Sequence, residues 1–347
     1  MTKINLRPEF FTETRRVLAE SGELRAEAFR YSTGVAALKV SNRRGSFTIL
    51  PFMGQMVWRC DFDGRELTMK SIFDEPRPCH ESFGESYGCF LMHCGMTAMG
   101  NPTAADSHPP HGELPFAPYG TAWIEAGRDQ RGEYFAVGGT YTHMRCFSCH
   151  HDFIPRVLLH VGATALEIET LVRNQKDLPL EYYYLCHVNH RPVDGSRIVE
   201  PPVRKPPIVN HEVPPGYFPV WAEATKIWLS KLDEDPTQMN EIGAAYESYR
   251  PEIVTCHFHK PDRKGWAKVS QNFPDGTGSV YVRYRPCELP YATRWIARTA
   301  DEDALGMCLP ATAEHKGLAY CRAHGQQRVL EPGEHVMFHV VTGLETP

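Results

Sequence analysis

The chain of 347 residues is long enough for one large β architecture or for two domains of ordinary size. Hydrophobic residues make up 42% of it and charged residues 23%, and the formal net charge of −5 excludes the basic surplus typical of nucleic-acid-binding proteins. No segment resembles a secretory signal or a membrane span, and the eleven scattered cysteines are typical of reduced thiols. We therefore expect a cytoplasmic protein with neither a nucleic-acid nor a membrane partner.

The N-terminal part, residues 1–29, is predicted to be a helical segment. Within residues 7–21, Pro8 suits a first helical turn, and apolar residues recur at helical spacing from Phe10 to Leu18. This short helix is the main helical element that the sequence predicts.

From residue 30 onward the pattern is that of β-strands. Residues 35–40 and 46–50 are short apolar or alternating segments separated by a polar turn that ends in Gly45, which is typical of a hairpin. Residues 166–173 alternate strictly between apolar and charged side chains, and after the turn at 174–179 a tyrosine-rich strand follows. We interpret these two segments as a pair of neighbouring strands.

The C-terminal part continues the β pattern with segments 327–330 and 335–342, separated by Glu331-Pro-Gly333. Residues 192–250 are rich in proline and are predicted to form an excursion over the surface, with a helix within 237–249. Many short strands with frequent turns favour a sandwich or barrel. We therefore predict one mainly β domain over residues 30–347.

The first candidate for a site is the segment His108-Pro-Pro-His111-Gly-Glu113. The prolines restrict the backbone, and Gly112 permits a close turn beside a ligand. His111 and Glu113 are two residues apart and would face the same way on an extended strand. An imidazole beside a carboxylate is suited to acid–base chemistry, although a polar turn that caps a strand would look similar.

The second candidate is the tyrosine-rich strand that contains His187 and Asn189. These two side chains share one face of the strand and alternate with apolar residues. An imidazole and an amide beside aromatic rings suit polyhydroxy ligands, because hydroxyls exchange hydrogen bonds in both directions and sugar C–H groups pack on rings. A buried histidine with an ordinary structural role is the competing interpretation.

Further residues could contribute to substrate binding. His93 lies in a glycine-flanked apolar segment, Trp295 is a large ring, and Lys70 and Arg298 could bind an anionic group on a substrate. Arg294 is a similar candidate, and both arginines are equally compatible with ordinary surface charges.

The segment Cys256-His257-Phe258-His259 places two imidazoles on one face of a strand, a spacing found in metal sites of β proteins. The sequence offers no clear third ligand for such a site. Phosphate-binding loops, dinucleotide fingerprints, zinc-peptidase helices and serine-hydrolase elbows are all missing from the sequence.

Several stretches together resemble the aldose 1-epimerase (galactose mutarotase-like) superfamily, in its DUF4432 branch. The resemblance covers nearly the whole chain and depends on order and spacing more than on any single motif. The segments that carry it are 50–58 with Asp63-Gly-Arg65, 88–100, 111–115, 180–195, and the tail from Ala304 to Gly333.

The resemblance implies an antiparallel β-supersandwich with a ligand cleft on its concave face. In that family a histidine of a His-Gly turn binds the sugar, which matches His111, and a second histidine protonates the ring oxygen, which matches His187. A carboxylate then removes the proton of the anomeric hydroxyl. The family usually carries this glutamate immediately before a late proline, where this chain has Leu309, so Glu314 or Glu113 would have to replace it.

Three functions therefore stay open. The first is a sugar-converting isomerase of the mutarotase type that needs no cofactor. The second is an isomerase, epimerase or lyase on a keto sugar or sugar acid, with a divalent metal held by His93, His111, Glu113 and His187. The third is a sugar-binding or sensing module without catalysis. In all three the partner is a small carbohydrate, and a homo-oligomer is left open.

Overall fold

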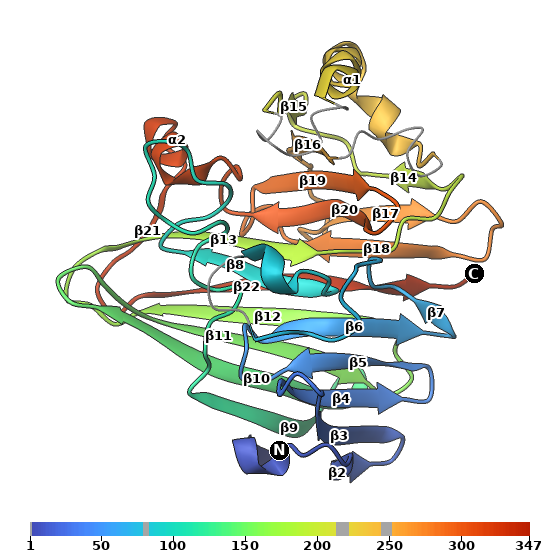
Figure 1. Ribbon diagram of the computed structural model, residues 1–347, viewed down its shortest axis with the longest axis vertical. Coiled ribbons are helices and arrows are strands. Elements are labelled where there is room, and N and C mark those ends of the chain that lie inside the picture. Colours follow the sequence, from blue (N-terminus) through green and yellow to red (C-terminus); the bar gives the residue numbers. More distant parts are fainter. Residues whose placement is uncertain (1, 79–82, 213–221, 244–251) are drawn as a thin grey trace.

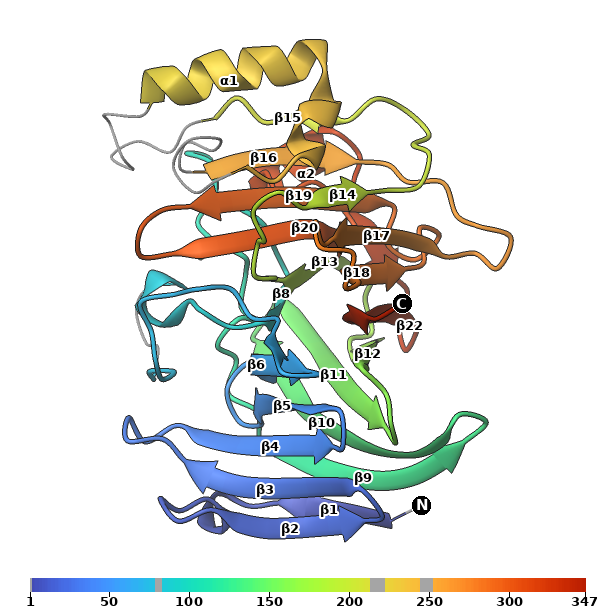
Figure 2. The same cartoon turned by 90° about the vertical axis from the view of Figure 1, so that its right-hand side faces the viewer.

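The computed structural model describes residues 2–78, 83–212, 222–243 and 252–347. Two large antiparallel sheets stack on each other (Figure 1). Figure 2 shows the N-terminal strands at one end of the stack and helix α1 (Ala222–Glu234) at the other. The mainly β fold predicted from the sequence is confirmed.

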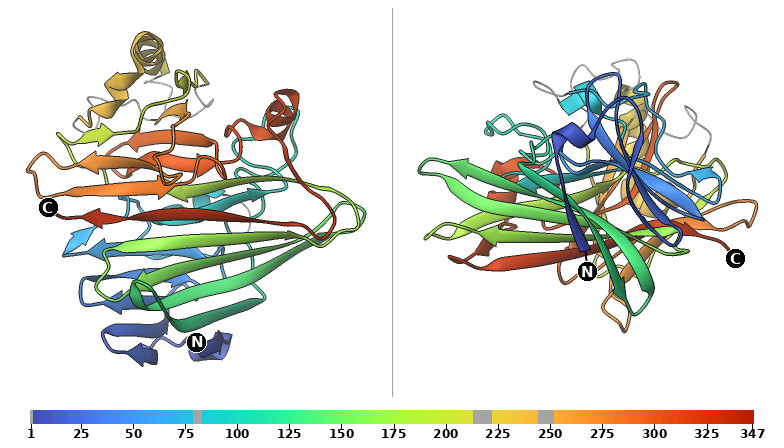
Figure 3. Two further views of the ribbon diagram at one scale, coloured as in Figure 1. Left: turned by 180° about the vertical axis from the view of Figure 1, so that it is seen from behind. Right: turned by 90° about the horizontal axis from the view of Figure 1, so that it is seen from below.

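The first sheet has nine strands, and its long central members are seen from behind in Figure 3. In spatial order it contains β1 (Thr2–Leu6), β9 (Thr121–Asp129), β10 (Gly132–Arg145), β11 (Cys149–His160), β12 (Ala165–Asn174), β22 (His335–Glu345), β18 (Ser279–Tyr284), β17 (Ala267–Asn272) and β14 (Arg197–Val199).

The second sheet has thirteen strands. Its main path runs through β15 (Ile208–Val209), β16 (Glu252–His257), β19 (Tyr291–Arg298), β20 (Asp303–Ala311), β13 (Leu180–Val188), β8 (Leu91–Met96), β6 (Met56–Phe62), β5 (Gly45–Leu50), β4 (Ala36–Asn42), β3 (Leu24–Arg30) and β2 (Arg16–Ser21). Beside this path, β21 (Arg328–Leu330) pairs with β13, and β7 (Arg65–Glu66) pairs with β6.

The described helices are short and lie in connections. Besides α1 they are α2 (Gly317–Ala323) and the 3-10 turns Pro8–Phe10, Phe83–Ser86 and Pro236–Asn240. No helix among the described residues is long and apolar enough to cross a membrane.

The predicted N-terminal helix is wrong. Pro8–Phe10 form a single 3-10 turn between strand β1, which ends at Leu6, and strand β2, which begins at Arg16. Strand β2 pairs with β3 from Arg16 to Ser21, and this ladder of hydrogen bonds outweighs the helical spacing of the apolar residues.

The predicted strands are present, but one predicted pairing is wrong. The hairpin of β4 and β5 forms as expected, with Asn42 opposite Gly45. Strands β12 and β13, in contrast, belong to different sheets, because β12 pairs with β11 and β22 whereas β13 pairs with β8 and β20. The turn at 174–179 therefore carries the chain from one sheet to the other.

The proline-rich segment 192–250 contains β14, β15, α1 and the turn Pro236–Asn240 among its described residues. The helix predicted within 237–249 is wrong over residues 237–243, where the 3-10 turn ends at Asn240, and 244–249 lie outside the described residues.

The main hydrophobic core fills the space between the sheets, because strands of both contribute alternate side chains to it. A second apolar cluster is formed by the thirteen-stranded sheet with its adjoining loops, on the face turned away from the nine-stranded sheet. We call this the open face. Figure 1 looks onto it, and the turn Phe83–Ser86 and helix α2 lie over it.

Candidate functional site

Strand β13 places His187 on the open face. Tyr184 and Cys186 belong to the core between the sheets, whereas Tyr183 and Leu185 belong to the open-face cluster. Since side chains alternate along a strand, His187 and Asn189 follow Leu185 onto the open face. The sequence-based prediction that both share a face holds, and the amide of Asn189 accepts a hydrogen bond from the Tyr87 hydroxyl at 3.2 Å.

His111 reaches the same place from a loop rather than a strand. Its φ is +61°, a left-handed conformation that is uncommon for a residue with a Cβ. The backbone holds this conformation at both ends, because His111 donates its N–H to Gly100 and its carbonyl accepts from Gly95, each at 2.9 Å. Such restrained left-handed residues concentrate at functional sites.

Gly112 allows this loop to press against strand β8. Its φ is +78°, and a Cβ there would lie 2.2 Å from the Ala98 carbonyl oxygen and 2.3 Å from that of Gly95. Any side chain at this position would therefore push the loop, and His111 with it, away from the sheet.

The two histidines meet beneath a set of aromatic rings. The rings of His111 and His187 stand edge to face with centroids 5.5 Å apart. Trp295 lies 5.5 Å from His187, Tyr87 lies 6.0 Å from it, and Phe83 lies 5.0 Å from His111, all between ring centroids. Imidazoles beside aromatic faces suit a ligand that carries hydroxyls on an apolar ring.

A third histidine, His315, joins this pair and was missed from the sequence. It is 7% exposed, and neither ring nitrogen has a hydrogen-bond partner among the described groups. Its backbone carbonyl accepts from Asn101, next to the Gly100 carbonyl that holds His111. The sequence shows His315 only as a polar residue directly after Glu314. Its position beside the other histidines depends on a backbone contact with the distant loop at Asn101.

All three imidazoles are neutral at pH 7. Burial lowers the pKa of His111 to about 4 and that of His315 to about 3. Burial and the neighbouring His111 lower the pKa of His187 well below its usual value, although Asn189 acts in the opposite direction. A proton taken up by any one of them would disfavour protonation of the others.

Leu309 lies on the open face, where the mutarotase resemblance calls for a carboxylate. It is 1% exposed and packs in the same cluster as Met92 and Leu185, with Trp295 against it. A leucine cannot accept a proton, so any base in this site must come from another residue.

Glu113 does not accompany His111, and the prediction that they face the same way is wrong. The left-handed backbone at His111 removes the extended geometry on which that prediction depended. The Glu113 carboxylate instead accepts from the N–H and hydroxyl of Thr97 and lies 3.6 Å from Nε2 of His151 in strand β11. It therefore points toward the nine-stranded sheet.

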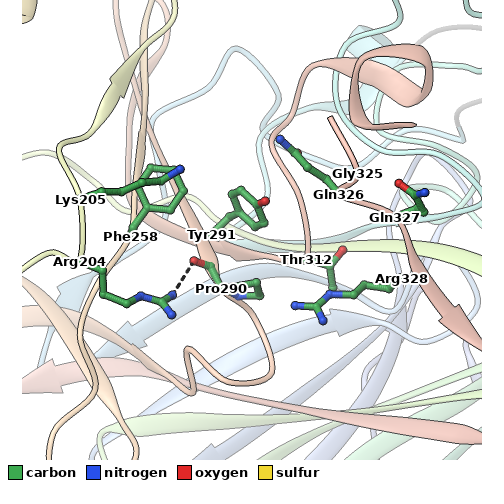
Figure 4. A pocket seen from close by; sticks show the side chains of 10 residues that line it. All are labelled: Arg204, Lys205, Phe258, Pro290, Tyr291, Thr312, Gly325, Gln326, Gln327 and Arg328. Atoms are coloured by element: carbon green, nitrogen blue, oxygen red, sulfur yellow. Dashed lines mark hydrogen bonds between the residues drawn. The ribbon is translucent and has the colours of Figure 1, made fainter. Parts of the chain in front are cut away.

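Glu314 is buried, and its Oε1 accepts a hydrogen bond from Gln326 at 2.7 Å. Its charge acts on Tyr291 and Cys256 and raises their pKa values, although burial is the larger cause for both. Gln326 and Tyr291 line a hollow of about 510 Å³ (Figure 4). Glu314 thus lies behind the wall of that hollow, hydrogen-bonded to the lining residue Gln326.

The hollow is rich in positive charge. Arg204, Lys205 and Arg328 line it, and none forms a salt bridge with a described carboxylate. Arg204 donates to the Pro290 carbonyl at 3.2 Å, and the Lys205 ammonium lies 3.9 Å from the centre of the Phe258 ring. Unpaired cations around one hollow suit an anionic group.

The structure does not bring three other predicted residues to the histidines. His93 pairs with Cys186 and points between the sheets, where its Nδ1 meets the Tyr184 hydroxyl at 2.8 Å. Arg298 is buried and bound by Asp194 and Asp303. The ammonium of Lys70 donates to the Ala300 carbonyl at the surface.

These placements separate the predicted metal ligands, because His93 and His187 occupy opposite faces of one sheet and Glu113 turns away from His111. Arg294 likewise is held by Glu200 and Asn240 rather than free to bind a substrate. The cluster that remains together consists of His111, His187 and His315.

Solved structures with a similar fold include proteins described as aldose 1-epimerase-like or galactose mutarotase-like. The chain matches a candidate aldose 1-epimerase from Klebsiella pneumoniae with a TM-score of 0.78 and 16% identity, over 99% of this chain and 87% of that one. It matches a galactose mutarotase-like protein from Clostridium acetobutylicum with a TM-score of 0.61 and 12% identity, over 94% and 99%. At these identities the likeness shows a galactose mutarotase-like fold.

The family follows from the sequence. The model described as Domain of unknown function (DUF4432) matches residues 32–212, and the chain belongs to this family. No curated protein matches the sequence. The fold and family that the sequence resembles are thus confirmed.

Proposed function

We propose that this chain converts a sugar by acid–base chemistry of the aldose 1-epimerase type, at His111, His187 and His315 on the open face. The observation that carries the proposal is the pair of buried imidazoles His111 and His187 beside Trp295 and Tyr87, with the buried His315 close enough to interact electrostatically with both. An aromatic wall binds the C–H face of a sugar ring, and imidazoles exchange protons with its hydroxyls.

The proton transfers need one imidazolium and one neutral imidazole. We assign His187 as the donor to the ring oxygen and His315 as the acceptor from the anomeric hydroxyl, with His111 holding a neighbouring hydroxyl. As the anomeric proton leaves, the bond from the anomeric carbon to the ring oxygen breaks and the ring oxygen takes the proton of His187. Rotation about the bond next to the carbonyl carbon and ring closure give the other anomer.

We further propose that the substrate carries an anionic group bound by Arg204, Lys205 and Arg328. Tyr291, which lines the hollow, shares the open-face cluster with Trp295, which contacts His187. A bound phosphate or carboxylate near the histidines would favour their protonated form, because an opposite charge raises the pKa of an imidazole. An anionic substrate would thus help to supply the donor.

A sugar-binding module without catalysis is the second candidate, and Leu309 favours it. The carboxylate that the resemblance calls for is replaced by a hydrocarbon side chain at the open face. In that case the histidines would bind hydroxyls without moving protons.

Exchange NMR on the anomers of a sugar panel tests the proposal. The panel contains neutral aldoses, hexose 6-phosphates and uronic acids, each mixed with the purified protein. The proposal expects anomer exchange faster than the solvent rate for at least one sugar, with the anionic members ahead of their neutral counterparts. Saturable binding without faster exchange would leave the binding module as the function.

A further inference from the structure

A second polar cluster lies between the two sheets, on the side of β16 and β19 away from the open face. It contains Glu200, which follows strand β14, and His257 and His259, which end or follow β16. Oε2 of Glu200 lies 2.9 Å from Nδ1 of His257 and 2.8 Å from Nε2 of His259. The three side chains each offer one ligand atom, and these atoms lie within 4.8 Å of one another.

His257 has an unused ring nitrogen in this cluster. The residue is 2% exposed, and its Nδ1 has no well-aligned hydrogen bond with any described group, although it lies 2.9 Å from the carboxylate. A buried polar atom without a well-aligned partner destabilises the fold unless something else satisfies it. Nδ1 of His257 and Oε2 of Glu200 are close together without the geometry of a good hydrogen bond. This arrangement is expected when both atoms bind one cation.

Both imidazoles are oriented by hydroxyls at their other nitrogens. Nε2 of His257 lies 2.9 Å from the Thr255 hydroxyl, and Nδ1 of His259 lies 2.8 Å from the Tyr284 hydroxyl. Metal-binding histidines almost always have such an outer partner, which fixes the tautomer and the ring orientation.

Arg294 is the outer partner of the carboxylate. Its guanidinium donates to Oε2 of Glu200 at 3.0 Å and is itself held by the carbonyl of Met307 and the side chain of Asn240. Ligating carboxylates commonly accept such a bond. The positive charge of Arg294 weakens cation binding, so we expect an affinity in the micromolar range rather than a tighter one.

We propose that Glu200, His257 and His259 bind one first-row divalent transition-metal ion, with Zn²⁺ as the best fit. Two imidazoles and a carboxylate suit Zn²⁺, Co²⁺ or Fe²⁺, whereas Ca²⁺ and Mg²⁺ prefer all-oxygen sites. Tetrahedral ligands at about 2.0–2.1 Å from a metal lie roughly 3.3 Å apart, so a small outward movement of the carboxylate from its 2.8 and 2.9 Å contacts would admit the ion. The carboxylate is 16% exposed, which offers a path for the ion.

The ion would connect elements of both sheets. Glu200 adjoins β14 of the nine-stranded sheet, and Tyr284 belongs to β18 of that sheet, whereas both histidines adjoin β16 of the other. An ion that binds only the folded chain stabilises it by mass action. The proposal concerns a site separate from the open-face histidines and does not depend on their chemistry.

Titration of chelator-treated protein with Co²⁺ tests the site. Wild-type chain should bind one Co²⁺ per chain, with visible absorption of an imidazole–carboxylate complex and without a sulfur charge-transfer band. Zn²⁺ should displace it and raise the melting temperature. Glu200→Gln and His259→Ala should each weaken Co²⁺ binding at least 100-fold, with circular dichroism confirming that each variant is folded.

Two other histidine variants serve as controls. The exposed His335→Ala and the open-face His315→Ala should bind Co²⁺ as the wild type does. The proposal is overturned if the wild-type chain shows no one-to-one binding, if folded Glu200→Gln binds Co²⁺ unchanged, or if His315→Ala abolishes binding. A sulfur charge-transfer band would also overturn it, because Cys256 would then be a ligand.

Discussion

The rings of His111 and His187 stand edge to face 5.5 Å apart, although one lies in a left-handed loop and the other on a central strand. Strand β8 connects them, because it pairs with β13 on one side and receives the backbone of the His111 loop through Gly95. The relative position of the two imidazoles is therefore set by main-chain hydrogen bonds, which restrains it more firmly than side-chain packing would.

His315→Ala should lower the catalytic efficiency of anomer exchange by a factor of about 10² to 10⁴, the usual contribution of a positioned proton-transfer group. The fold should survive, because neither ring nitrogen forms a hydrogen bond among the described groups. Initial rates by exchange NMR check this against the exposed control His335→Ala. An unchanged rate in His315→Ala would remove this histidine from the mechanism.

The pH dependence of kcat/KM should show that only a small fraction of the protein carries the protonated donor imidazole at neutral pH. Burial lowers the pKa of His111 to about 4 and also lowers that of His187. At a pH well above these pKa values, the fraction of protein with one protonated imidazole rises about tenfold for each unit by which the pH falls. We expect kcat/KM to rise about tenfold from pH 8 to pH 7 and again to pH 6. A flat profile would contradict an imidazolium donor.

Arg328→Gln should weaken the binding of anionic ligands much more than that of neutral ligands. The substitution removes one of three cations around the hollow but keeps a polar, though shorter, side chain. We expect the dissociation constant of a hexose phosphate to rise about tenfold or more while that of the matching neutral hexose stays within a factor of two. Isothermal titration at two salt concentrations measures both, and equal changes for the two ligands would contradict anion recognition.

As the pH falls, the free energy of unfolding should decrease at a higher pH than is usual when carboxylates alone drive acid denaturation. A buried histidine with a lowered pKa contributes stability that is complete above pH 6.5 and is lost as the pH falls toward its folded-state pKa, because the unfolded chain takes up the proton first. At pH 5.5 each such group costs up to about 1.4 kcal/mol. The buried histidines with lowered pKa are His93, His111, His151, His187, His190, His257, His259 and His315.

Urea unfolding at pH 8, 6.5, 5.5 and 5.0 measures this effect. The midpoint should be nearly constant between pH 8 and 7 and should fall steeply below pH 6.5. Carboxylates with lowered pKa values act mainly at lower pH, so they do not account for a loss in this window. A midpoint independent of pH down to 5.0 would mean that these imidazoles are not protected from protonation.

Local patterns in the sequence predicted the strands and the two central histidines. The alternation of side chains in β13 placed His187 on the face of the strand that does not carry the core-facing Cys186. The restricted His-Gly turn indicated His111. Both signals depend on the chain near the residue itself. The N-terminal helix failed for the converse reason, since the pairing of β2 with β3 outweighs local spacing.

The positions of three site residues depend on contacts between segments far apart in the chain, so local sequence patterns could not predict them. His93 lies opposite Cys186 across the β8–β13 ladder, so it faces the core, and only that pairing reveals it. His315 reaches the open face because its backbone meets the loop at Asn101. The third ligand beside His257 and His259 was likewise hidden, because Glu200 is brought to them from another sheet.

Catalysis at the open face is tested most directly by exchange NMR on wild-type protein, His187→Ala and the exposed control His335→Ala, with a hexose 6-phosphate as substrate. Catalysis by the open-face histidines predicts exchange above the solvent rate for the wild type and the control. It also predicts a loss of about 10² or more in His187→Ala with the fold intact. Equal exchange in all three proteins, or none above solvent in the wild type with any anionic or neutral sugar, would contradict it.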